Sequence, residues 1–491
     1  MRYIATFDIG TTAIKGVLVS ENGEPVYTNS LDIETIFEED KKEQRPDDWY
    51  QAFLKISRNF ISQYNKSNII GIVMSGQMQD VILIDHENRA IDNAILYSDG
   101  RAEKQAIEIE GLIGNATILN YTGNDFNGSI PFAKLLWMKQ NKYDIYQNIY
   151  KVLFSSKDYI IAKLTNHYVS DVTSCATTGL MDIHRKQWMK EWMEQFQISY
   201  DILPQLAYAN EKAGGITELG AIESGYQVGT PVYVGTGDAG ATTLASGISR
   251  EGEYNINLGT SGWVASVSKD VLNRQGVFNL AAIQKDLFIN VVPFLNAGNV
   301  HKWISTTLTP EDMQEHKYDY IDQLLQNSST GSHGVIFLPY IAGERFPVMD
   351  PDIKGCYIGI VPETTKQDMA RACLEGVAYS IRQGMESIGR SPNKISIIGG
   401  GARCKTWCQI LADMLNHEVF VYDDSEYLPS MAVAAAAMID LGIISEYQTF
   451  TNSIQDSKAC TCYKPDETAK VYYDAAFMKY CSIYPLIRKI E

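Results

Sequence analysis

The 491-residue sequence lacks the features that would place it in a membrane or in a secreted class. No apolar run approaches the about 20 residues that a membrane-spanning helix needs. The chain opens directly on residues of a predicted strand, so we expect no signal peptide. Low-complexity tracts are also missing from the sequence. These absences predict a globular protein of the cytoplasm with no membrane partner.

Clustered positive charge is equally scarce. The chain has 42 Lys and Arg against 59 Asp and Glu, which gives a net charge of −17. Nucleic acids and anionic membranes are bound through clustered Lys and Arg, so neither is an expected partner. If the ligand is itself an anion, the protein must hold it with backbone amides, helix N-termini or a bound cation.

Cysteine is sparse and scattered. There are eight cysteines, and Cys460 and Cys462 form the only tight pair. No four-ligand metal spacing is present, and Cys404 and Cys408 fall on a predicted helix. We expect free thiols in a reducing compartment.

The length exceeds what one ordinary core accommodates and predicts two domains. We place them at residues 1–246 and 247–491, with a polar joint at residues 249–253. An Ala-rich segment at residues 430–441 predicts a tightly packed helix, which lies beside a ligand or simply against other helices.

Residues 232–262 organise the rest of the chain. A short apolar strand enters a Gly-rich turn with one carboxylate, Asp238, and a helix of small residues follows at 239–247. A second strand, residues 254–258, enters Asn257-Leu-Gly-Thr-Ser-Gly262. A strand running into Gly-Thr-Ser-Gly can surround an anion with N–H groups and hydroxyls, because glycine lets the backbone approach closely. A lone carboxylate at a strand end can accept a proton.

The second turn has a counterpart at the N-terminus. Residues 4–9 lead into Asp8-Ile-Gly-Thr-Thr12, and residues 14–19 lead out. Both segments follow the order strand, Asp or Asn, one residue, Gly-Thr, Thr or Ser, strand, which indicates a duplicated module. Two such turns facing each other from two domains can clamp a polyphosphate.

A third glycine turn supports a nucleotide ligand. A strand at residues 394–398 enters Gly399-Gly400-Gly401, and a predicted helix starts near Cys404. A strand, a glycine turn and a helix N-terminus together bind anions and nucleotides. A single glycine triplet is weak evidence, but after the duplicated turns it favours an adenosine and α-phosphate site.

These turns, together with Asp238 in GTGDAGA, resemble the FGGY carbohydrate kinases, from about residue 3 to about residue 485. Within that family the sequence is most similar to the xylulokinase branch. The resemblance implies an α/β protein with a duplicated, two-domain actin-like ATPase (ribonuclease H-like) fold. It further implies a cleft between the domains, with the sugar held by the first domain and ATP mainly by the second.

The resemblance also implies roles for individual residues. Asp238 is the expected catalytic base, which removes a proton from the sugar hydroxyl, and Asp8 and Asp238 are the expected Mg²⁺ ligands. The expected contacts to ATP are Gly10, Thr11, Thr12, Lys15, Gly259, Thr260, Ser261, Gly298, Gly400, Gly401 and Ala402.

The implied sugar contacts, besides Asp238, are Gln77, Met78, Gln79, Asp80, Asp99 and Arg101. Xylulokinases read Gly-Gln-Met-His-Gly where this chain has Gln79 and Asp80 in the last two places, and they usually carry Asn where it has Ala239. These departures put the identity of the sugar in doubt more than the reaction. A plain polar hairpin at residues 75–80, and an ordinary Asp99–Arg101 ion pair, are the structural alternatives.

Other segments match the family without implying chemistry. Residues 122–137 resemble the segment that closes over the sugar, whereas 156–159 and 170–171 resemble structural segments. Glu344 and Arg345 are expected to shape the cleft. Thr364 and Gln367 have capping-box spacing and predict a helix that continues to about residue 388.

The leading hypothesis is ATP-dependent phosphorylation of D-xylulose to D-xylulose 5-phosphate, by a protein that could form a homodimer. Another pentulose, a sugar alcohol or an aldonate stays open as the acceptor, the aldonate ranking lower because the sugar-side segments offer only Arg101 as a cation. Two hypotheses from other classes are a catalytically inactive sensor of sugar and nucleotide, and a mechanochemical or chaperone ATPase of the same fold. The sugar-side segments argue against the last of these.

Overall fold

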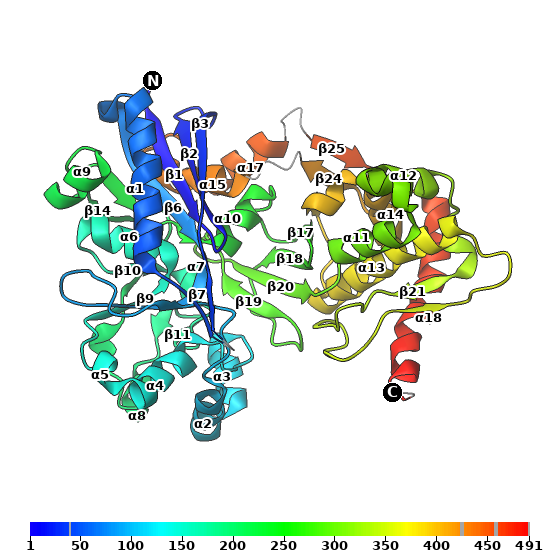
Figure 1. Ribbon diagram of the computed structural model, residues 1–491, viewed down its shortest axis with the longest axis horizontal. Helices are drawn as coiled ribbons and strands as arrows, with labels where there is room; N and C mark the ends of the chain where they lie inside the picture. Colours follow the sequence, from blue (N-terminus) through cyan, green and yellow to red (C-terminus); the bar gives the residue numbers. More distant parts are fainter. Residues whose placement is uncertain (39–40, 423–426, 456–459, 490–491) are drawn as a thin grey trace.

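A computed structural model describes residues 1–38, 41–422, 427–455 and 460–489 of the chain. It shows two lobes, each built around a mixed seven-stranded sheet (Figure 1). No helix in these four ranges is both long enough and apolar enough to cross a bilayer.

The sheet of the first lobe has the order β14-β15-β6-β1-β2-β3, with β16 also beside β6. Its strands are β1 Tyr3–Ile9, β2 Ala13–Ser20, β3 Pro25–Asp32, β6 Ile69–Gly76, β14 Lys212–Gly215, β15 Pro231–Tyr233 and β16 Thr236–Gly237. Strands β1, β2 and β3 are antiparallel, and β6 runs parallel to β1.

The sheet of the second lobe has the order β19-β20-β18-β17-β23-β24-β25. Its strands are β17 Glu253–Leu258, β18 Gly262–Ser268, β19 Phe278–Ala281, β20 Phe288–Phe294, β23 Lys394–Ile398, β24 Val419–Tyr422 and β25 Cys460–Tyr463. Strands β17, β18 and β20 are antiparallel, and β23 runs parallel to β17. This repeats the pattern of the first sheet, so the predicted duplication is confirmed.

A second, five-stranded sheet of the first lobe has the order β4-β5-β8-β7-β9. Its strands are β4 Ile36–Glu38, β5 Lys41–Gln44, β7 Met78–Ile84, β8 Ala94–Ile95 and β9 Lys151–Ser155. Strand β7 follows β6 after the single residue Gln77, so the segment expected to bind the sugar joins the two sheets.

Helices cover both faces of the first seven-stranded sheet. On one face lie α1 (Pro46–Gln63) and α6 (Ser156–Thr165), and Trp49, Phe53 and Phe60 are buried there at helical spacing. The other face is covered by α10 (Asp238–Ala245), α15 (Leu428–Ala432) and α16 (Ala434–Asp440).

The Ala-rich segment therefore returns from the C-terminal half of the chain to the first lobe. Ala432 to Ala437 are buried in one cluster with Ile4, Val17 and Val73 of the first sheet. Small side chains let these short helices pack closely on the strands, so plain packing accounts for this composition. The domain boundary at residue 246 stays a prediction.

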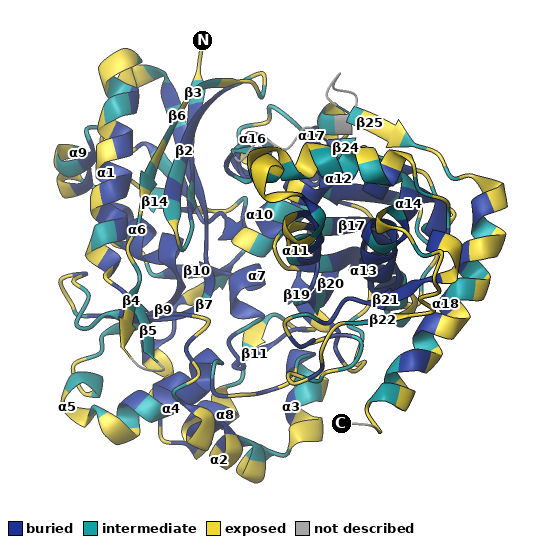
Figure 2. Ribbon diagram, turned by 45° about the vertical axis from the view of Figure 1, so that its right-hand side comes forward, coloured by how far each residue is buried: buried dark blue, intermediate teal, exposed yellow. Residues whose placement is uncertain are grey.

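The core of the second lobe is centred on α13, Lys366–Ile388. Around it lie α11 (Gly298–Leu308), α12 (Lys317–Gln326), α14 (Lys405–Leu415) and α18 (Glu467–Ile487). Along α1 and α18, buried and exposed residues alternate between the inner and outer helix faces (Figure 2).

The predicted capping box of α13 was wrong by one residue. Thr365 and Asp368 cap the helix reciprocally, instead of Thr364 and Gln367. The Thr364 hydroxyl oxygen accepts from the Val361 N–H at 2.9 Å, which closes the preceding turn instead. Two successive threonines allowed both registers from sequence alone.

Candidate active site

Asp8 lies in β1 and Asp238 follows β16, two strands that flank β6 and run parallel to it. In the register, Asp8 of β1 pairs with Ser75 of β6, and Thr236 of β16 pairs with the same Ser75 from the other side. Asp238 comes two residues after Thr236, as the first residue of α10. The two carboxylates therefore lie on either side of the carboxyl end of β6, where a helix N-terminus also favours negative charge.

Each of these two carboxyl groups has a raised pKa. Asp238 is reached by solvent, yet the surrounding protein replaces enough water to raise its pKa to about 7, and the charge of Asp8 adds to this. Burial likewise raises the pKa of Asp8, against a 2.7 Å hydrogen bond from the Ser75 hydroxyl and the charge of Lys15, which lower it. A group with a pKa near 7 is suited to accept a proton at neutral pH.

A buried ionic network holds the turn that carries Asp238. The Lys157 ammonium lies 2.6 Å from Asp158 and 2.8 Å from Asp171, and all three side chains are essentially inaccessible. The Gly237 N–H donates to Asp171 Oδ2 at 3.1 Å. Pairing with the two carboxylates raises the pKa of Lys157 against the effect of burial, and Lys157 lowers the pKa of Asp171. Burial raises the pKa of Asp158. These are the segments expected to be structural, and their contact to Gly237 gives that role a direct connection to Asp238.

Two glutamines hold the turn Asp8-Ile-Gly-Thr-Thr12, called here the first hydroxyl-glycine turn; the second is Asn257-Leu-Gly-Thr-Ser-Gly262. The Thr11 hydroxyl donates to Gln77 Oε1 at 2.7 Å, and Gln44 Nε2 donates to the Thr11 carbonyl at 2.6 Å. Gln77 Nε2 donates in turn to Gln44 Oε1 at 2.9 Å. Gln77, expected to bind the sugar, is thus buried and directed at this turn. Thr12 is exposed, so its hydroxyl is accessible to a ligand.

The expected nucleotide contacts of the second lobe come together. Gly298 at the start of α11 donates its N–H to the Gly259 carbonyl at 2.7 Å, and a Cβ on Gly298 would lie 2.5 Å from that oxygen. A Cβ on Gly399 would meet the Leu258 backbone at 2.8 Å. Only glycine permits these approaches. Thr260, Ser261 and Gly400 are exposed around them, whereas Gly401 and Ala402 are buried.

A cavity of about 480 Å³ lies between the two lobes. Its walls include Lys42, Gln79 and Tyr97 from the first lobe and Phe278 and Arg345 from the second. The segment expected to close over the sugar contributes Asn124 and its neighbours. A space of this size, lined by amide, hydroxyl and cationic groups, fits a small polyhydroxylated ligand.

Gln79 is the one predicted sugar contact of the 77–101 region among the cavity-lining residues. Its backbone is left-handed, with a φ of 65°, which is uncommon for a residue other than glycine. Its amide donates to the Ser129 hydroxyl at 3.0 Å and to the Ser129 carbonyl at 3.2 Å. The Gln79 substitution noted in the sequence therefore changes the cavity wall itself.

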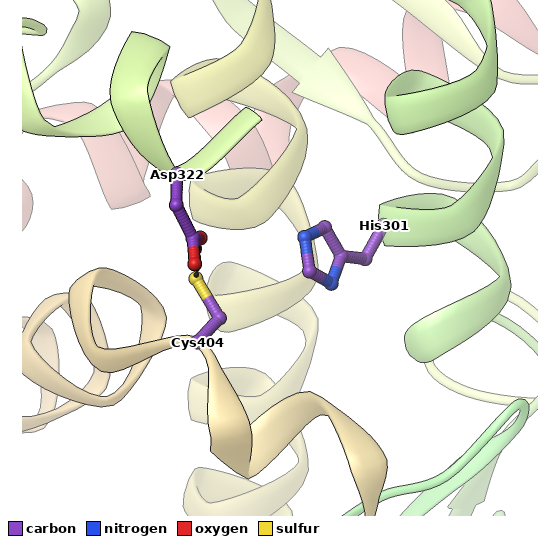
Figure 3. A group of neighbouring side chains, drawn as sticks. All are labelled: His301, Asp322 and Cys404. Atoms are coloured by element: carbon purple, nitrogen blue, oxygen red, sulfur yellow. Dashed lines mark hydrogen bonds between the residues drawn. The ribbon is translucent and has the colours of Figure 1, made fainter. Parts of the chain in front are cut away.

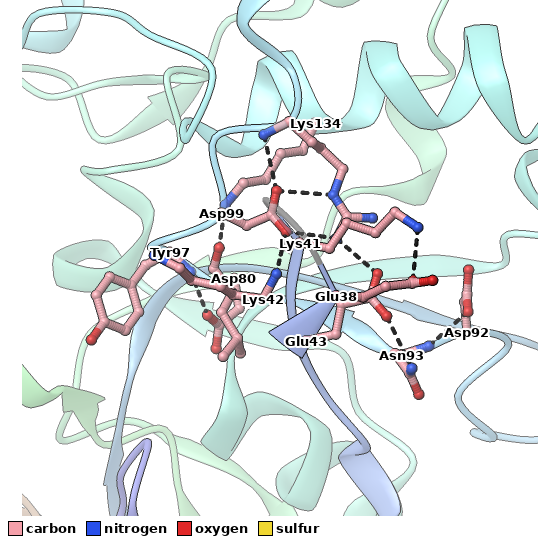
Figure 4. Close-up of polar contacts among 12 residues, drawn as sticks. Glu38, Lys41, Lys42, Glu43, Asp80, Asp92, Asn93, Tyr97, Asp99 and Lys134 are labelled. Atoms are coloured by element: carbon pink, nitrogen blue, oxygen red, sulfur yellow. Dashed lines mark hydrogen bonds and ion pairs between the residues drawn. The ribbon is translucent and has the colours of Figure 1, made fainter. Parts of the chain in front are cut away.

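Asp80, next to Gln79 in the chain, accepts from the Tyr97 N–H at 3.2 Å (Figure 4), and the charge of Lys134 acts on it. Both side chains are inaccessible, and burial raises the pKa of Asp80 well above its usual range. Burial also lowers the pKa of Lys134 to about 7, although the ammonium donates to the Leu96 carbonyl at 2.7 Å. Asp80 Oδ2 is buried without a hydrogen-bond partner. Lys134 had no recognisable signal in the sequence.

Asp99 and Arg101 form the bidentate pair that the sequence suggested. Arg101 donates to both Asp99 oxygens, at 2.9 and 2.6 Å, and also contacts Glu43 at 2.8 Å. Asp99 is inaccessible and also accepts from the Lys42 N–H at 2.7 Å. With both oxygens occupied, the geometry favours the ordinary ion pair over direct sugar binding.

Asn124 connects the two lobes beside the cavity, and Glu344 holds a turn of the second lobe. Asn124 Nδ2 donates to the Asn279 carbonyl, and its Oδ1 accepts from the Asn279 N–H, both at 2.8 Å. Glu344 is buried and accepts from the Leu295 N–H at 2.6 Å, which agrees with the expected cleft-shaping role. The sequence offered no signal for the contact between Asn124 and Asn279.

Comparison with known proteins identifies the family to which the chain belongs. Residues 3–245 match the N-terminal domain of the FGGY family of carbohydrate kinases, and residues 254–438 match its C-terminal domain. The xylulose kinase of Staphylococcus xylosus is 30% identical over 496 residues, which cover 99% of this chain and 100% of that relative. A gluconokinase of Bacillus subtilis (strain 168) is 28% identical over 442 residues, covering 86% of this chain and 85% of the relative.

A solved structure shows how far the fold agrees. The ligand-bound xylulose kinase from Lactobacillus acidophilus has a TM-score of 0.89 to this chain at 25% identity, over 99% of both chains. The protein is thus a phosphotransferase with the actin-like ATPase fold. More narrowly, it belongs to the FGGY family of carbohydrate kinases, and its resemblance to the xylulokinase branch is confirmed.

Proposed function

We propose that this sugar kinase transfers the γ-phosphoryl group of MgATP to D-xylulose, giving D-xylulose 5-phosphate. The observation that carries the proposal is the position of Asp238, a carboxylate with a pKa of about 7, beside Asp8 and the first hydroxyl-glycine turn. Several relatives over nearly the whole chain are xylulose kinases, which supports the choice of acceptor.

In the proposed reaction Asp238 accepts the proton of the attacking sugar hydroxyl. Phosphoryl transfer depends mainly on alignment and charge neutralisation, and a positioned base adds about 10²–10⁴ in rate. The hydroxyl-glycine turns and the Gly298 and Gly399–Gly401 backbone bind the nucleotide, and approach of the two lobes excludes water from the transfer.

Asp8 and Asp238 fit a Mg²⁺ ion by their chemistry. Both offer the hard oxygen ligands that Mg²⁺ prefers. Burial raises the pKa of Asp238 and the charge of Asp8 adds to this, a repulsion that a divalent cation relieves. When bound, the ion supplies neutralisation of phosphate charge.

D-Gluconate is the second candidate acceptor, favoured by one observation. Lys42 and Arg345 both line the cavity, whereas Arg101 is already paired with Asp99 and Glu43. Two cations suit the carboxylate of an aldonate, which the sequence alone ranked below the other acceptors. A gluconokinase is also among the relatives.

A coupled assay of ADP release, run with Mg²⁺ over D-xylulose, other pentuloses, polyols and D-gluconate, tests the proposal. The expected result is turnover highest with D-xylulose and well above the rate with water as the only acceptor. Higher kcat/KM with gluconate, with a KM raised by Lys42→Met and Arg345→Met, would transfer the assignment to the aldonate. No acceptor raising turnover above the water rate would leave the inactive sensor as the better explanation.

A further inference from the structure

His301, Asp322 and Cys404 form a compact cluster in the second lobe (Figure 3). His301 lies on α11, Asp322 on α12, and Cys404 immediately precedes α14. One imidazole nitrogen, one carboxylate oxygen and the Sγ atom all lie within 4.8 Å of one another. Three separate elements therefore direct three different donor atoms to one point.

The imidazole of His301 has an unused nitrogen directed at this point. The residue is only 7% exposed, and its Nε2 has no hydrogen-bond partner. Figure 3 shows a ring nitrogen facing Asp322 and Cys404. The rings of Tyr318 and Trp407 flank the imidazole, at 5.2 and 5.6 Å between centroids, and they hold it in this orientation. Buried polar atoms in native proteins normally have a partner, so this nitrogen calls for a ligand.

The other two donors contact each other, and one of them is partly exposed. Cys404 Sγ donates to Asp322 Oδ1 at 3.3 Å, so the thiol and the carboxylate already face each other. Cys404 is buried, whereas Asp322 is only partly buried and leaves a route for a small ion from the side of α12.

We propose that His301 Nε2, an Asp322 oxygen and Cys404 Sγ bind one Zn²⁺ ion, with water as the fourth ligand. Nitrogen, sulfur and oxygen donors together select zinc over Mg²⁺ and Ca²⁺, which prefer oxygen alone. As the Zn–S bond forms, the thiol loses its proton to solvent. The resulting thiolate and the Asp322 carboxylate balance the two charges of the ion.

The geometry requires only small side-chain shifts. Zinc bonds of about 2.0–2.3 Å in a tetrahedral arrangement separate ligand atoms by about 3.3–3.7 Å. The three atoms here lie within 4.8 Å of one another, so small side-chain rotations bring them to the separations that a zinc ion requires.

The ion would link two elements that carry expected nucleotide contacts, α11 and the glycine turn before α14. His301 follows Gly298 by one turn of α11, and Cys404 follows Gly401 at the end of the glycine turn. The site shares no residue with the Asp8 and Asp238 pair. Its role would be to fix α11, α12 and the start of α14 relative to one another.

The test uses the full chain, freed of metal with a chelator and then dialysed against Zn²⁺ or Co²⁺. We expect one equivalent of metal per chain and, with Co²⁺, the absorption of a tetrahedral thiolate complex. His301→Leu and Cys404→Ser should each weaken binding by more than about tenfold and abolish the thiolate band, since even loss of indirect supporting contacts costs that much. Asp322→Asn is a third variant, and because Asp322 is partly exposed this substitution disturbs folding less than the other two.

Two controls separate this cluster from other thiols. Cys408→Ser removes a buried cysteine of α14 whose Sγ contacts the Ala402 carbonyl, and it should leave metal binding unchanged. The double variant Cys460→Ser, Cys462→Ser removes the tight surface pair and should also have no effect. Absence of stoichiometric Zn²⁺, binding unaffected by His301→Leu and Cys404→Ser, or binding lost with the Cys460 and Cys462 pair would overturn the proposal.

Discussion

At the scale of single residues, the proposed reaction depends on the surroundings of two aspartates. Asp8 and Asp238 emerge on either side of β6, and each lies in surroundings that disfavour its charge. A carboxylate that resists ionisation is a stronger proton acceptor than one in water. The same two groups can attract a cation that neutralises them both.

Asp238→Asn should lower kcat by about 10²–10⁴ while nucleotide affinity changes little, because the amide keeps the shape and loses the basic oxygen. Steady-state ADP release and equilibrium nucleotide binding measure the two effects. Asp319→Asn, at an exposed position of α12, is the matched control and should behave as the unsubstituted protein. Undiminished turnover of Asp238→Asn would refute the role of a base.

The pH dependence of kcat/KM should follow the pKa of Asp238. The folded-state pKa is raised to about 7, so protonation removes the base below that pH and activity should rise as pH increases through about 7. A profile of kcat/KM against pH reports the free enzyme and measures this midpoint. The protein is kept without saturating Mg²⁺ until the assay starts. A flat profile between pH 6 and 8 would contradict it.

The same shift has a consequence for stability with the opposite sign. A carboxyl group whose pKa is raised on folding binds more protons in the folded state. Its contribution to stability is complete below the pKa of the unfolded chain and is lost as the pH rises through about 7. Asp238→Asn should therefore melt at an equal or higher temperature at pH 8. A lower melting temperature there would show that the carboxylate stabilises the fold.

At the scale of elements, the turn before α10 is held from beneath by α6, β10 (Val169–Asp171) and α7 (Val172–Cys175). Lys157 of α6 pairs with Asp158 and Asp171, and Asp171 in turn accepts from the Gly237 and Ser174 N–H groups. A buried pair of this kind adds little net stability but becomes costly when one partner is removed.

Lys157→Met should destabilise the protein by about 3–5 kcal/mol, because it leaves two buried carboxylates without their cation. Urea unfolding measures the loss, and the surviving folded fraction should also show lower kcat through displacement of Asp238. Lys190→Met, whose lysine is largely exposed and only 3.9 Å from Glu194, is the control and should cost under about 1 kcal/mol. Equal stabilities of the two variants would remove the network from the account.

Element boundaries were predictable where the chain carried its own signals. The strand-turn-strand units around Gly10 and Gly259 were predictable from the order of their residues. The cap of α13 was misplaced because two adjacent threonines satisfy the same pattern. Gln77 was predicted to contact the sugar, and this stays a prediction. The structure adds that its side chain accepts from Thr11, which the sequence did not reveal because a polar side chain at a strand end does not show which way it turns.

At the scale of the whole molecule, the two lobes are not two separate stretches of sequence. Helices α15 and α16 come from the C-terminal half, yet their alanines complete the hydrophobic cluster on the first sheet. The first lobe is thus completed by residues more than half a chain away.

A chain of residues 1–246 alone should fail to fold cooperatively, because one face of its sheet would lose the cover of α10's partners α15 and α16. We expect strong binding of a hydrophobic dye and a broad thermal transition, against weak binding and a sharp transition for the full chain. A sharp transition and weak dye binding by residues 1–246 would show that the first lobe is independent of the C-terminal half.

The sequence by itself determined the α/β class, the duplicated turns, the family and the acidic residue expected to act as base. These features are written in short segments, because turn chemistry and hydrophobic spacing act over a few residues. Only the tertiary structure decided which predicted contacts reach the cavity, that Lys42 and Arg345 line it, and that α15 and α16 cover the first sheet. The same holds for His301, Asp322 and Cys404, whose donor atoms meet only after three helical segments pack. Contacts between distant residues depend on packing geometry, which no local pattern in the chain records.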